Sequence, residues 1–381
     1  MGNAADAVFD HEREEKMHLL KQEWKKLVTR DGFLAVFLLC FAVTLLILWN
    51  RVYRISYGDS FLPSQYCRVA DRVQNMTETE AEKYFSEEQQ EYDPVRSVIQ
   101  KEWRSAHNYE NYLDKIRSGG SGGLRGLGKN VYQERLQKKL QAKYREMDPA
   151  EVSFAGGRGV SLFCHTDVAD MMAVLMMLLI IFRLVGWEAG SGMDGINMAA
   201  RNGAAWLTRI KWAVGLMASA AVLLLVQLYK LRLYTSAYGF TGWNRVIQVL
   251  PEFVGVDRRI TVYWFVCVFL VCKTAGFLLL YTIFFWLACV GRSAVRTVIL
   301  YGLFTGVSLF TAYGISLSGY LAVLRYFSLA QCINQEMLLS GYHALKLFQY
   351  PVSYLGLWTA VSGVLFFVLA GLIFRSRIRR V

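Results

Sequence analysis

Two long apolar stretches separated by one polar loop constrain the fold of this chain most. Residues 171–187 read MMAVLMMLLIIFRLVGW, and residues 212–231 read WAVGLMASAAVLLLVQLYKL. Each stretch approaches the roughly 20 residues that a helix needs to cross the hydrocarbon layer of a membrane. The loop between them, residues 188–211, carries several Gly residues together with Arg201 and Lys211. Because Lys and Arg beside a span mark its cytoplasmic side, we predict a helical hairpin whose turn lies in the cytoplasm.

Composition supports a membrane protein rather than a soluble one. Of the 381 residues, 54% are hydrophobic, the mean hydropathy is +0.28 and the formal net charge is +12. A basic chain raises the question of nucleic-acid binding. Here the cations stand mostly beside the apolar stretches, and no run of interleaved basic and aromatic residues is present. We therefore expect the lipid bilayer, and no nucleic acid, as a partner.

The same reasoning along the chain predicts an all-α polytopic protein of the cell membrane. Lys and Arg at the expected cytoplasmic junctions place both termini in the cytoplasm. The six predicted transmembrane helices are residues 33–50, 167–187, 212–231, 260–290, 297–317 and 353–374. The predicted cytoplasmic segments are residues 1–32, 188–211, 291–296 and 375–381, and the predicted outer segments are residues 51–166, 232–259 and 318–352.

The N-terminal segment has the pattern of an amphipathic helix. Met17, Leu20, Trp24 and Leu27 recur at three- and four-residue steps, and lysines flank them. This pattern is typical of a helix lying in the cytoplasmic interface of a membrane, which would connect into the first span. The simpler interpretation is a basic flank that only sets the orientation of that span.

The large outer segment, residues 51–166, is expected to be mostly helical. Asp93 and Pro94 supply an N-cap and a first-turn proline for a helix that runs to about Ile116. A Gly-rich stretch at residues 119–128 interrupts it, and a second helix follows to about Met147. The stretch lacks the Lys-Ser/Thr pair of a phosphate-binding loop, so we interpret it as a hinge in a helical arm or hairpin.

Cysteines and acidic residues give little sign of a metal centre. The seven cysteines form no CxxC pair and have no metal-like spacing with the histidines. A Cys67–Cys164 bridge would join the two ends of the outer segment, but the odd count disfavours it. Asp167 and Asp170 stand where they can cap the second span. Other acidic residues form a run that we interpret as a solvated face: Glu78, Glu80, Glu82, Glu87, Glu88 and Glu91.

Lys273 lies inside the fourth predicted span. An ionisable residue within a membrane is costly, so it is a functional candidate by default. The alternative is that its side chain extends toward the outer surface from a long tilted helix. We favour this second interpretation, because no acidic residue within a span offers an obvious partner.

Two further features of the later spans are open to more than one interpretation. Gly302 and Gly306 form a small-xxx-small pair, which permits close helix approach either within the chain or at a subunit interface. Residues 318–352 are too polar to cross a membrane and too apolar to stand free in water. We expect interfacial helices or a partly re-entrant element there.

Catalytic motifs are missing from the sequence. It contains no P-loop, no GxSxG and no HExxH. His165 stands beside Cys164 and near Asp167, but adjacency in sequence does not create the geometry of a catalytic triad. We therefore expect no enzymatic activity, no metal and no cofactor in this chain, and any work that it does must draw energy from a partner.

The whole chain resembles the transmembrane subunits of ABC-2-type ATP-binding-cassette exporters, namely bacterial six-span permeases with a large outer domain between the first two spans. The resemblance rests on KQEWKKLVTRDGFLAVF before and into the first span, and on FRLVGWEAGSGMDGINMAARNGAAWLTRIK after the second. Glu188, Gly190, Arg201-Asn202-Gly203 and Lys211 match the family pattern of the cytoplasmic turn. This sequence has extra Gly residues there and lacks the Thr-Pro turn common in relatives.

The resemblance implies a permease that pairs with a second copy or a sister permease and docks a cytoplasmic ATPase subunit, which carries the ATP and Mg²⁺. In such proteins the elbow seats in a groove of the ATPase. The implied contact residues are Glu188, Gly190, Gly195, Asn197, Arg201, Asn202 and Gly203 in the elbow and Trp24, Lys25, Lys26 and Arg30 in the connecting helix. The substrate would be a peptide, a lipid or a hydrophobic small molecule.

Two other classes of function remain open. A membrane sensor or scaffold would use its outer helical arm to bind a ligand or partner without transport, and no ATPase would copurify with it. A polytopic membrane enzyme would gather polar catalytic residues at one depth in its spans, and the sequence shows no such grouping.

Overall fold

The structure is a computed structural model, and it describes residues 21–25, 32–53, 61–87, 93–118, 131–186, 203–291, 294–309, 329–347 and 350–375. These residues are mostly helical, and five of their helices are long and apolar enough to cross a membrane. The prediction of a mostly helical chain with several helices able to cross a membrane is thereby confirmed. The five helices are α2 (Phe33–Tyr53), α9 (Val168–Ile181) with its continuation, α12 (Gly203–Ala237), α13 (Val262–Gly291) and α18 (Tyr354–Arg375).

The helices differ from the predicted spans mainly at their ends. α9 is preceded by the short helix α8 (Arg158–Cys164) and continues as a π-helical turn, Phe182–Gly186. α12 extends beyond residues 212–231 at both ends. In place of the predicted span 297–317, the structure describes the shorter apolar helix α14 (Ala294–Leu309), and residues 310–317 lie outside the described part.

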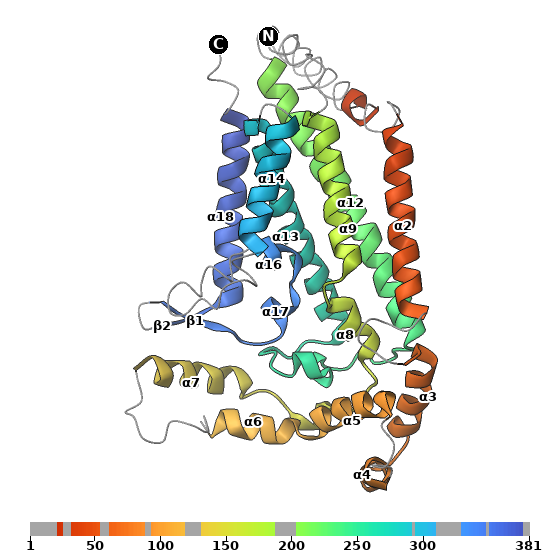
Figure 1. Cartoon of the computed structure of the whole chain (residues 1–381). Coiled ribbons are helices and arrows are strands. Elements are labelled where there is room, and N and C mark those ends of the chain that lie inside the picture. Colours follow the sequence, from red (N-terminus) through yellow and green to blue (C-terminus); the bar gives the residue numbers. More distant parts are fainter. Residues whose placement is uncertain are drawn as a thin grey trace, which may run out of the picture.

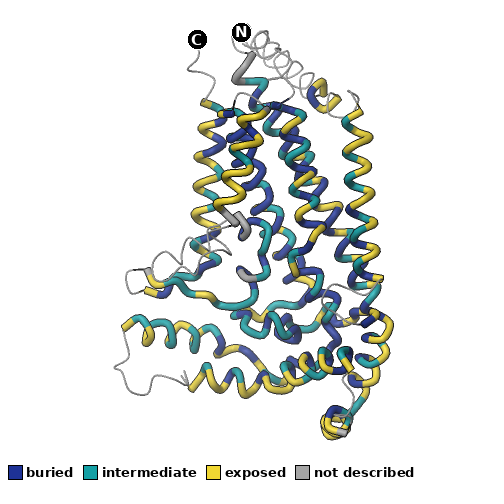
Figure 2. Tube along the Cα trace, in the orientation of Figure 1, coloured by how far each residue is buried: buried dark blue, intermediate teal, exposed yellow. Residues whose placement is uncertain are grey.

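Burial divides the spans into central and peripheral helices (Figure 2). More than half of the apolar window of α13 is buried, against 11% of that of α2. Both helices are apolar around most of their circumference. In a soluble protein, a helix that is apolar all round would be covered by other parts of the protein. The exposed Leu39 and Leu46 of α2 therefore face outward as lipid-contacting residues do, while α13 forms the centre of the bundle.

Two glycines mark where helices approach α13 closely. A Cβ at Gly215 of α12 would lie 2.1 Å from the hydroxyl of Tyr281 on α13. That hydroxyl donates a hydrogen bond to the carbonyl of Trp212 at 3.2 Å. A Cβ at Gly276 of α13 would lie 2.4 Å from the carbonyl oxygen of Cys332. Larger residues at either glycine would push the backbones apart.

Five helices lie across one end of the bundle (Figure 1), and we refer to them as the platform. Since α2 starts and α18 finishes at the opposite end, we call that the terminal end. The chain reaches the platform after α2 and leaves it before α8. The platform helices are α3 (Pro63–Gln74), α4 (Glu78–Glu87), α5 (Pro94–His107), α6 (Tyr109–Arg117) and α7 (Val131–Tyr144).

The predicted helical hairpin is present within the platform. The side chain of Asp93 accepts a hydrogen bond from the backbone of Val95 at 2.9 Å, which confirms the N-cap. The helix expected to run on to Ile116 is interrupted at Asn108 and forms α5 and α6 instead. Arg117 then donates to the carbonyl of Met147 at 2.7 Å, which links the end of α6 to the end of α7.

A buried tyrosine holds three helices of this region together. The hydroxyl of Tyr66 on α3 donates to a carboxylate oxygen of Glu102 on α5 at 2.5 Å, and both side chains are buried. It also accepts from the backbone of Arg158 at the start of α8 at 3.4 Å. Burial, and next the negative charge of Glu102, raise the pKa of Tyr66 well above its ordinary value. Tyr66 therefore stays protonated and remains a donor to Glu102.

The predicted outer segment 232–259 lies at the platform end (Figure 1). Of the predicted outer segment 318–352, the structure describes residues 329–347 and 350–352. They run from Cys332, which packs against Gly276 near the middle of α13, to the platform end. The first contains short 3-10 turns at Ile247–Val249 and Pro251–Phe253. The second contains the short helices α16 (Leu329–Ile333) and α17 (Glu336–Leu339).

The second of these segments also forms an antiparallel hairpin of β1 (Ala344–Leu347) and β2 (Tyr350–Ser353). Lys139 of α7 donates to the carbonyl of Pro351 at 3.0 Å, which attaches the hairpin to the platform. The all-α prediction omitted these strands, because their pairing depends on contacts that local periodicity does not contain.

All seven cysteines are free. Cys67 is partly buried and donates weakly to the carbonyl of Ala237 at 3.5 Å, while Cys164 is fully buried. The Cys67–Cys164 bridge considered from the sequence is therefore not formed.

Candidate functional site

Most of the predicted ATPase-contact residues lie outside the described part of the chain. These are Glu188, Gly190, Gly195, Asn197, Arg201 and Asn202 in the elbow and Lys26 and Arg30 in the connecting helix. Gly203 is described as the first residue of α12. Trp24 and Lys25 are described within a helical segment, and both are exposed. The contacts proposed for this region therefore stay predictions.

The residues on either side of the predicted elbow are described. The π-helical turn that follows α9 ends at Gly186, and α12 begins at Gly203, both at the terminal end of the bundle (Figure 1). Cations lie along several helices near this end, among them Arg183, Arg209, Lys211 and Arg375. The two helix ends that flank residues 187–202 thus lie opposite to the platform.

Gly302 and Gly306 lie on α14. A Cβ added to either glycine would meet no atom within 4 Å. Among the described residues, no helix of this chain packs against the pair. Of the two interpretations drawn from the sequence, close packing inside the chain thus receives no support, and the subunit interface stays a prediction.

Lys273 is buried within the bundle, and it has an acidic partner. Its Nζ lies 2.7 Å from Oδ1 of Asp170, and the two side chains are 2% and 1% exposed. The favoured interpretation from the sequence, a side chain that extends toward the outer surface, is therefore wrong. It failed because Asp170 was considered only as a cap of its own helix.

Asp167 and Asp170 do cap α9, as predicted. Oδ1 of Asp167 accepts from the backbone of Ala169 at 3.1 Å, and Oδ2 of Asp170 accepts from the backbone of Asp167 at 3.0 Å. This reciprocal arrangement is a capping box, which satisfies backbone donors that the first turn of a helix leaves without partners. The caps also fix both carboxylates at the platform end of the bundle.

A second buried lysine contacts the same carboxylates. Lys230 of α12 is completely buried, and its Nζ lies 3.1 Å from Oδ2 of Asp167 and 3.5 Å from Oδ2 of Asp170. It also donates to the carbonyl of His165 at 2.7 Å. Lys230 was not predicted as a partner of these carboxylates, because it stands at the edge of the third apolar stretch. Lys230 and Asp167 both stand at the predicted outer ends of their spans, and this shared depth could have indicated the contact.

Two more side chains complete this group. Nη1 of Arg51, near the end of α2, lies 3.7 Å from Oδ2 of Asp167. The amide of Gln227 on α12 donates to Oδ1 of Asp170 at 2.6 Å. We call the group the charge cluster, and its members are Arg51, Asp167, Asp170, Gln227, Lys230 and Lys273.

The charge cluster connects α2, α9, α12 and α13 near the points where the chain enters and leaves the platform. Buried charges are tolerated when they are paired and hydrogen-bonded. A group of this kind contributes little net stability compared with apolar packing, but removing one partner leaves a buried charge uncompensated. Its formal charge is +1, from three cations and two carboxylates. The cluster therefore fixes the relative positions of four helices and penalises any movement that separates them.

Cys164, His165 and Asp167 do not form a catalytic triad. Nδ1 of His165 pairs with Glu336 of α17 at 2.7 Å, and the carboxylate of Asp167 pairs with Lys230 and Arg51. Cys164 is fully buried. The three side chains are thus committed to different partners.

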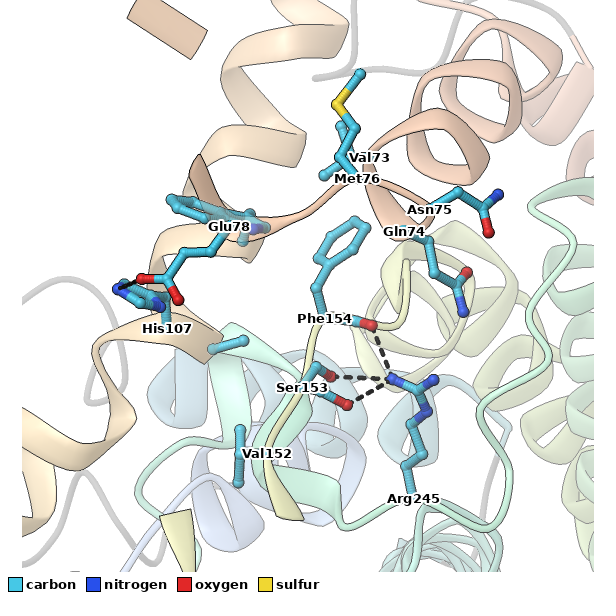
Figure 3. A pocket seen from close by; sticks show the side chains of 12 residues that line it. Val73, Gln74, Asn75, Met76, Glu78, His107, Val152, Ser153, Phe154 and Arg245 are labelled. Carbon is cyan, nitrogen blue, oxygen red and sulfur yellow. Dashed lines mark hydrogen bonds and ion pairs between the residues drawn. The ribbon is translucent and has the colours of Figure 1, made fainter. Parts of the chain in front are cut away.

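A pocket of about 450 Å³ opens within the platform (Figure 3). Its wall includes Arg245, which donates to the carbonyl and hydroxyl of Ser153 at 3.2 and 2.8 Å and to the carbonyl of Phe154 at 2.8 Å. The residues that line it are Val73, Gln74, Asn75, Met76, Glu78, Trp103, Ala106, His107, Val152, Ser153, Phe154 and Arg245. The pocket is open to the surface, and its lining combines aromatic, amide and charged groups.

Comparisons with known proteins identify no relative. No family model, no curated protein and no solved structure matches this chain.

Proposed function

We propose that this chain is the membrane-spanning permease subunit of an ABC-type exporter of the ABC-2 class, working with a separate ATPase subunit. The observation that supports this most is that Gly186 and Gly203, the described residues on either side of the elbow, both lie at the terminal end, away from the platform. The basic residues near the terminal end favour a cytoplasmic location for it. An ATPase in the cytoplasm would then meet the elbow directly.

The direction of the helices supports six spans. α13 ends at the terminal end, whereas α18 begins near the platform (Figure 1). We assign the remaining crossing between them to the predicted fifth span, of which α14 is the described part. We assign six crossings to the chain, which would leave both termini in the cytoplasm of a cell-membrane protein and residues 51–166 outside.

The charge cluster gives such a permease a way to transmit force. ATP binding can move the spans only if the ATPase binds one permease conformation more tightly than the other. A displacement of the elbow would be carried along α9 and α12, which both contribute to the cluster. The cluster also includes Arg51 at the entry to the platform and lies beside its exit. Movement of the hairpin would thus be transmitted to the outer segment. The proposed substrate is a peptide, a lipid or a hydrophobic small molecule.

The test is copurification of the chain with its ATPase from native membranes. We expect Arg201→Glu to reduce the recovered ATPase about tenfold or more, because reversing a charge at an interface costs several kcal/mol. Glu188→Ala should weaken docking and ATPase activity in the same assay. Lys101→Glu makes the same charge reversal on an exposed residue of α5 and is the control. Equal ATPase recovery from Arg201→Glu and Lys101→Glu would contradict the elbow assignment.

The platform pocket favours a second candidate, a membrane sensor or scaffold that binds a ligand without transporting it. This function needs no ATPase. Purification of the intact chain with bound ligand, but with no ATPase under conditions that keep ABC complexes together, would favour it over the permease.

A further inference from the structure

Three side chains with metal-binding atoms converge beside the pocket. Glu78 and Glu82 lie one turn apart on α4, and His107 is the last residue of α5. One ligand atom from each residue lies within 4.8 Å of the other two. Glu78 and His107 also line the pocket, and Figure 3 shows them paired at its edge. We call these three residues the His107 site.

The imidazole is held in a fixed orientation. The ring of His107 stacks on the indole of Trp103, with centroids 5.2 Å apart and planes 8° apart. Trp103 in turn packs against Phe85 of α4 at 5.6 Å. Nε2 of His107 then lies 2.9 Å from a carboxylate oxygen of Glu78. The stacking therefore presents one ring nitrogen to α4, and a positioned ligand needs less ordering when a metal binds.

α4 is fixed as well. Ala81 and Phe85 on its inner face are buried. At its start, Glu80 accepts hydrogen bonds from the backbone and the hydroxyl of Thr77, both at 2.8 Å. Glu80 therefore bonds back to Thr77, the residue before α4, while Glu78 and Glu82 lie near His107. The site thus joins two anchored helices rather than two mobile loops.

The donor set favours a transition metal over Ca²⁺ or Mg²⁺. One imidazole nitrogen and two carboxylate oxygens suit Zn²⁺, whereas Ca²⁺ and Mg²⁺ prefer sites made of oxygen alone. Two carboxylates beside one imidazole also leave negative charge that a divalent cation neutralises. Three protein ligands leave at least one coordination position for water or an incoming group.

We propose that Glu78, Glu82 and His107 bind one Zn²⁺ ion at the edge of the platform pocket. The remaining coordination position is available to a donor atom of a ligand in that pocket. This inference concerns the platform alone and does not depend on whether the chain is a permease.

The competing explanation is an ordinary exposed ion pair between His107 and Glu78. These side chains are 42% and 61% exposed, and such pairs are common on surfaces without any metal. The two explanations differ at Glu82, because an ion pair of His107 with Glu78 does not require it. Glu82→Gln is therefore the decisive variant.

The experiment titrates the purified full-length chain in detergent micelles with Zn²⁺ by calorimetry, and with Co²⁺ by absorption spectroscopy. The wild type is expected to bind one equivalent of either metal ion. The absorption bands of bound Co²⁺ should be those typical of a low coordination number. Glu78→Gln, Glu82→Gln and His107→Gln should each weaken binding by more than about tenfold, since even second-shell partners of a metal contribute 10- to 100-fold. Glu110→Gln, which removes an exposed carboxylate on α6, should bind as the wild type does.

Trp103 provides a local readout. Co²⁺ quenches nearby indole fluorescence, so the quenching seen in the wild type should fall sharply in Trp103→Phe. Absence of saturable Zn²⁺ binding by the wild type would overturn the proposal. So would Zn²⁺ affinity in Glu82→Gln and His107→Gln equal to that of the wild type, because the metal would then be bound elsewhere.

Discussion

The charge cluster and the His107 site are built from similar side chains in opposite surroundings. In the cluster, Asp170, Lys230 and Lys273 are almost completely buried among apolar spans. In the His107 site, both members of the ion pair are exposed. Water can replace a lost partner at the surface but not in the bundle. The same removal of one carboxylate should thus have a large effect on stability in one place and a small effect in the other.

The largest effect is expected for Asp170→Ala. This change removes the partner of Lys273 and one partner of Lys230, leaving buried positive charge uncompensated. We expect the stability of the folded protein to fall by about 3–5 kcal/mol. Thermal unfolding in micelles, followed by tryptophan fluorescence, measures the change. Asp71→Ala, at an exposed position of α3, is the control.

A double variant sharpens this prediction. Asp170→Asn combined with Lys273→Met removes both charges of the pair, and should recover much of the stability that Asp170→Ala loses, because replacing both partners is far less costly than stranding one. If the double variant unfolds at as low a temperature as Asp170→Ala, the lost ion pair is not the cause.

An intermediate effect is expected for Tyr66→Phe in the platform. The change removes the donor to the buried carboxylate of Glu102. Hydrogen bonds to charged groups contribute about 1.5–3 kcal/mol, so we expect a loss in that range. The measurement is again thermal unfolding. Tyr350→Phe, at an exposed tyrosine, removes a hydroxyl without that partner and should unfold like the wild type.

The smallest effect is expected for Glu78→Gln measured without added metal. The ion pair with His107 is exposed, and pairs of this kind contribute about 0.2–1 kcal/mol. The unfolding temperature should therefore move little, while Zn²⁺ binding is strongly weakened. A large loss of stability would show that the site has a structural role, and would remove the contrast with the charge cluster.

The sequence predicted the spans well because their signal is local. Long apolar stretches located α9, α13 and α18, and Asp93 and Asp167 located two helix starts. The fifth predicted span, residues 297–317, was also recognised from an apolar stretch. Among the described residues, only α14 corresponds to it.

The candidate sites were harder to predict, because they depend on contacts between distant segments. Lys273 and Asp170 were both recognised, yet the rotation of α9 against α13 that brings them together is set by packing rather than by sequence spacing. His107 and Glu82 were not connected for the same reason. The strands β1 and β2 were not predicted, because strand pairing depends on contacts across the hairpin and the local composition of this segment does not indicate it.

The charge cluster also has a consequence for biosynthesis. A chain is made from its N-terminus, so the carboxylates at the start of α9 are synthesised before Lys230 and Lys273, which belong to α12 and α13. Until those later helices arrive, Asp170 has neither lysine beside it. Release of the second span into lipid before the third and fourth are made would expose an isolated carboxylate to hydrocarbon. The order of synthesis therefore favours an assembly in which α9 stays near the insertion machinery until Lys230 and Lys273 have been made.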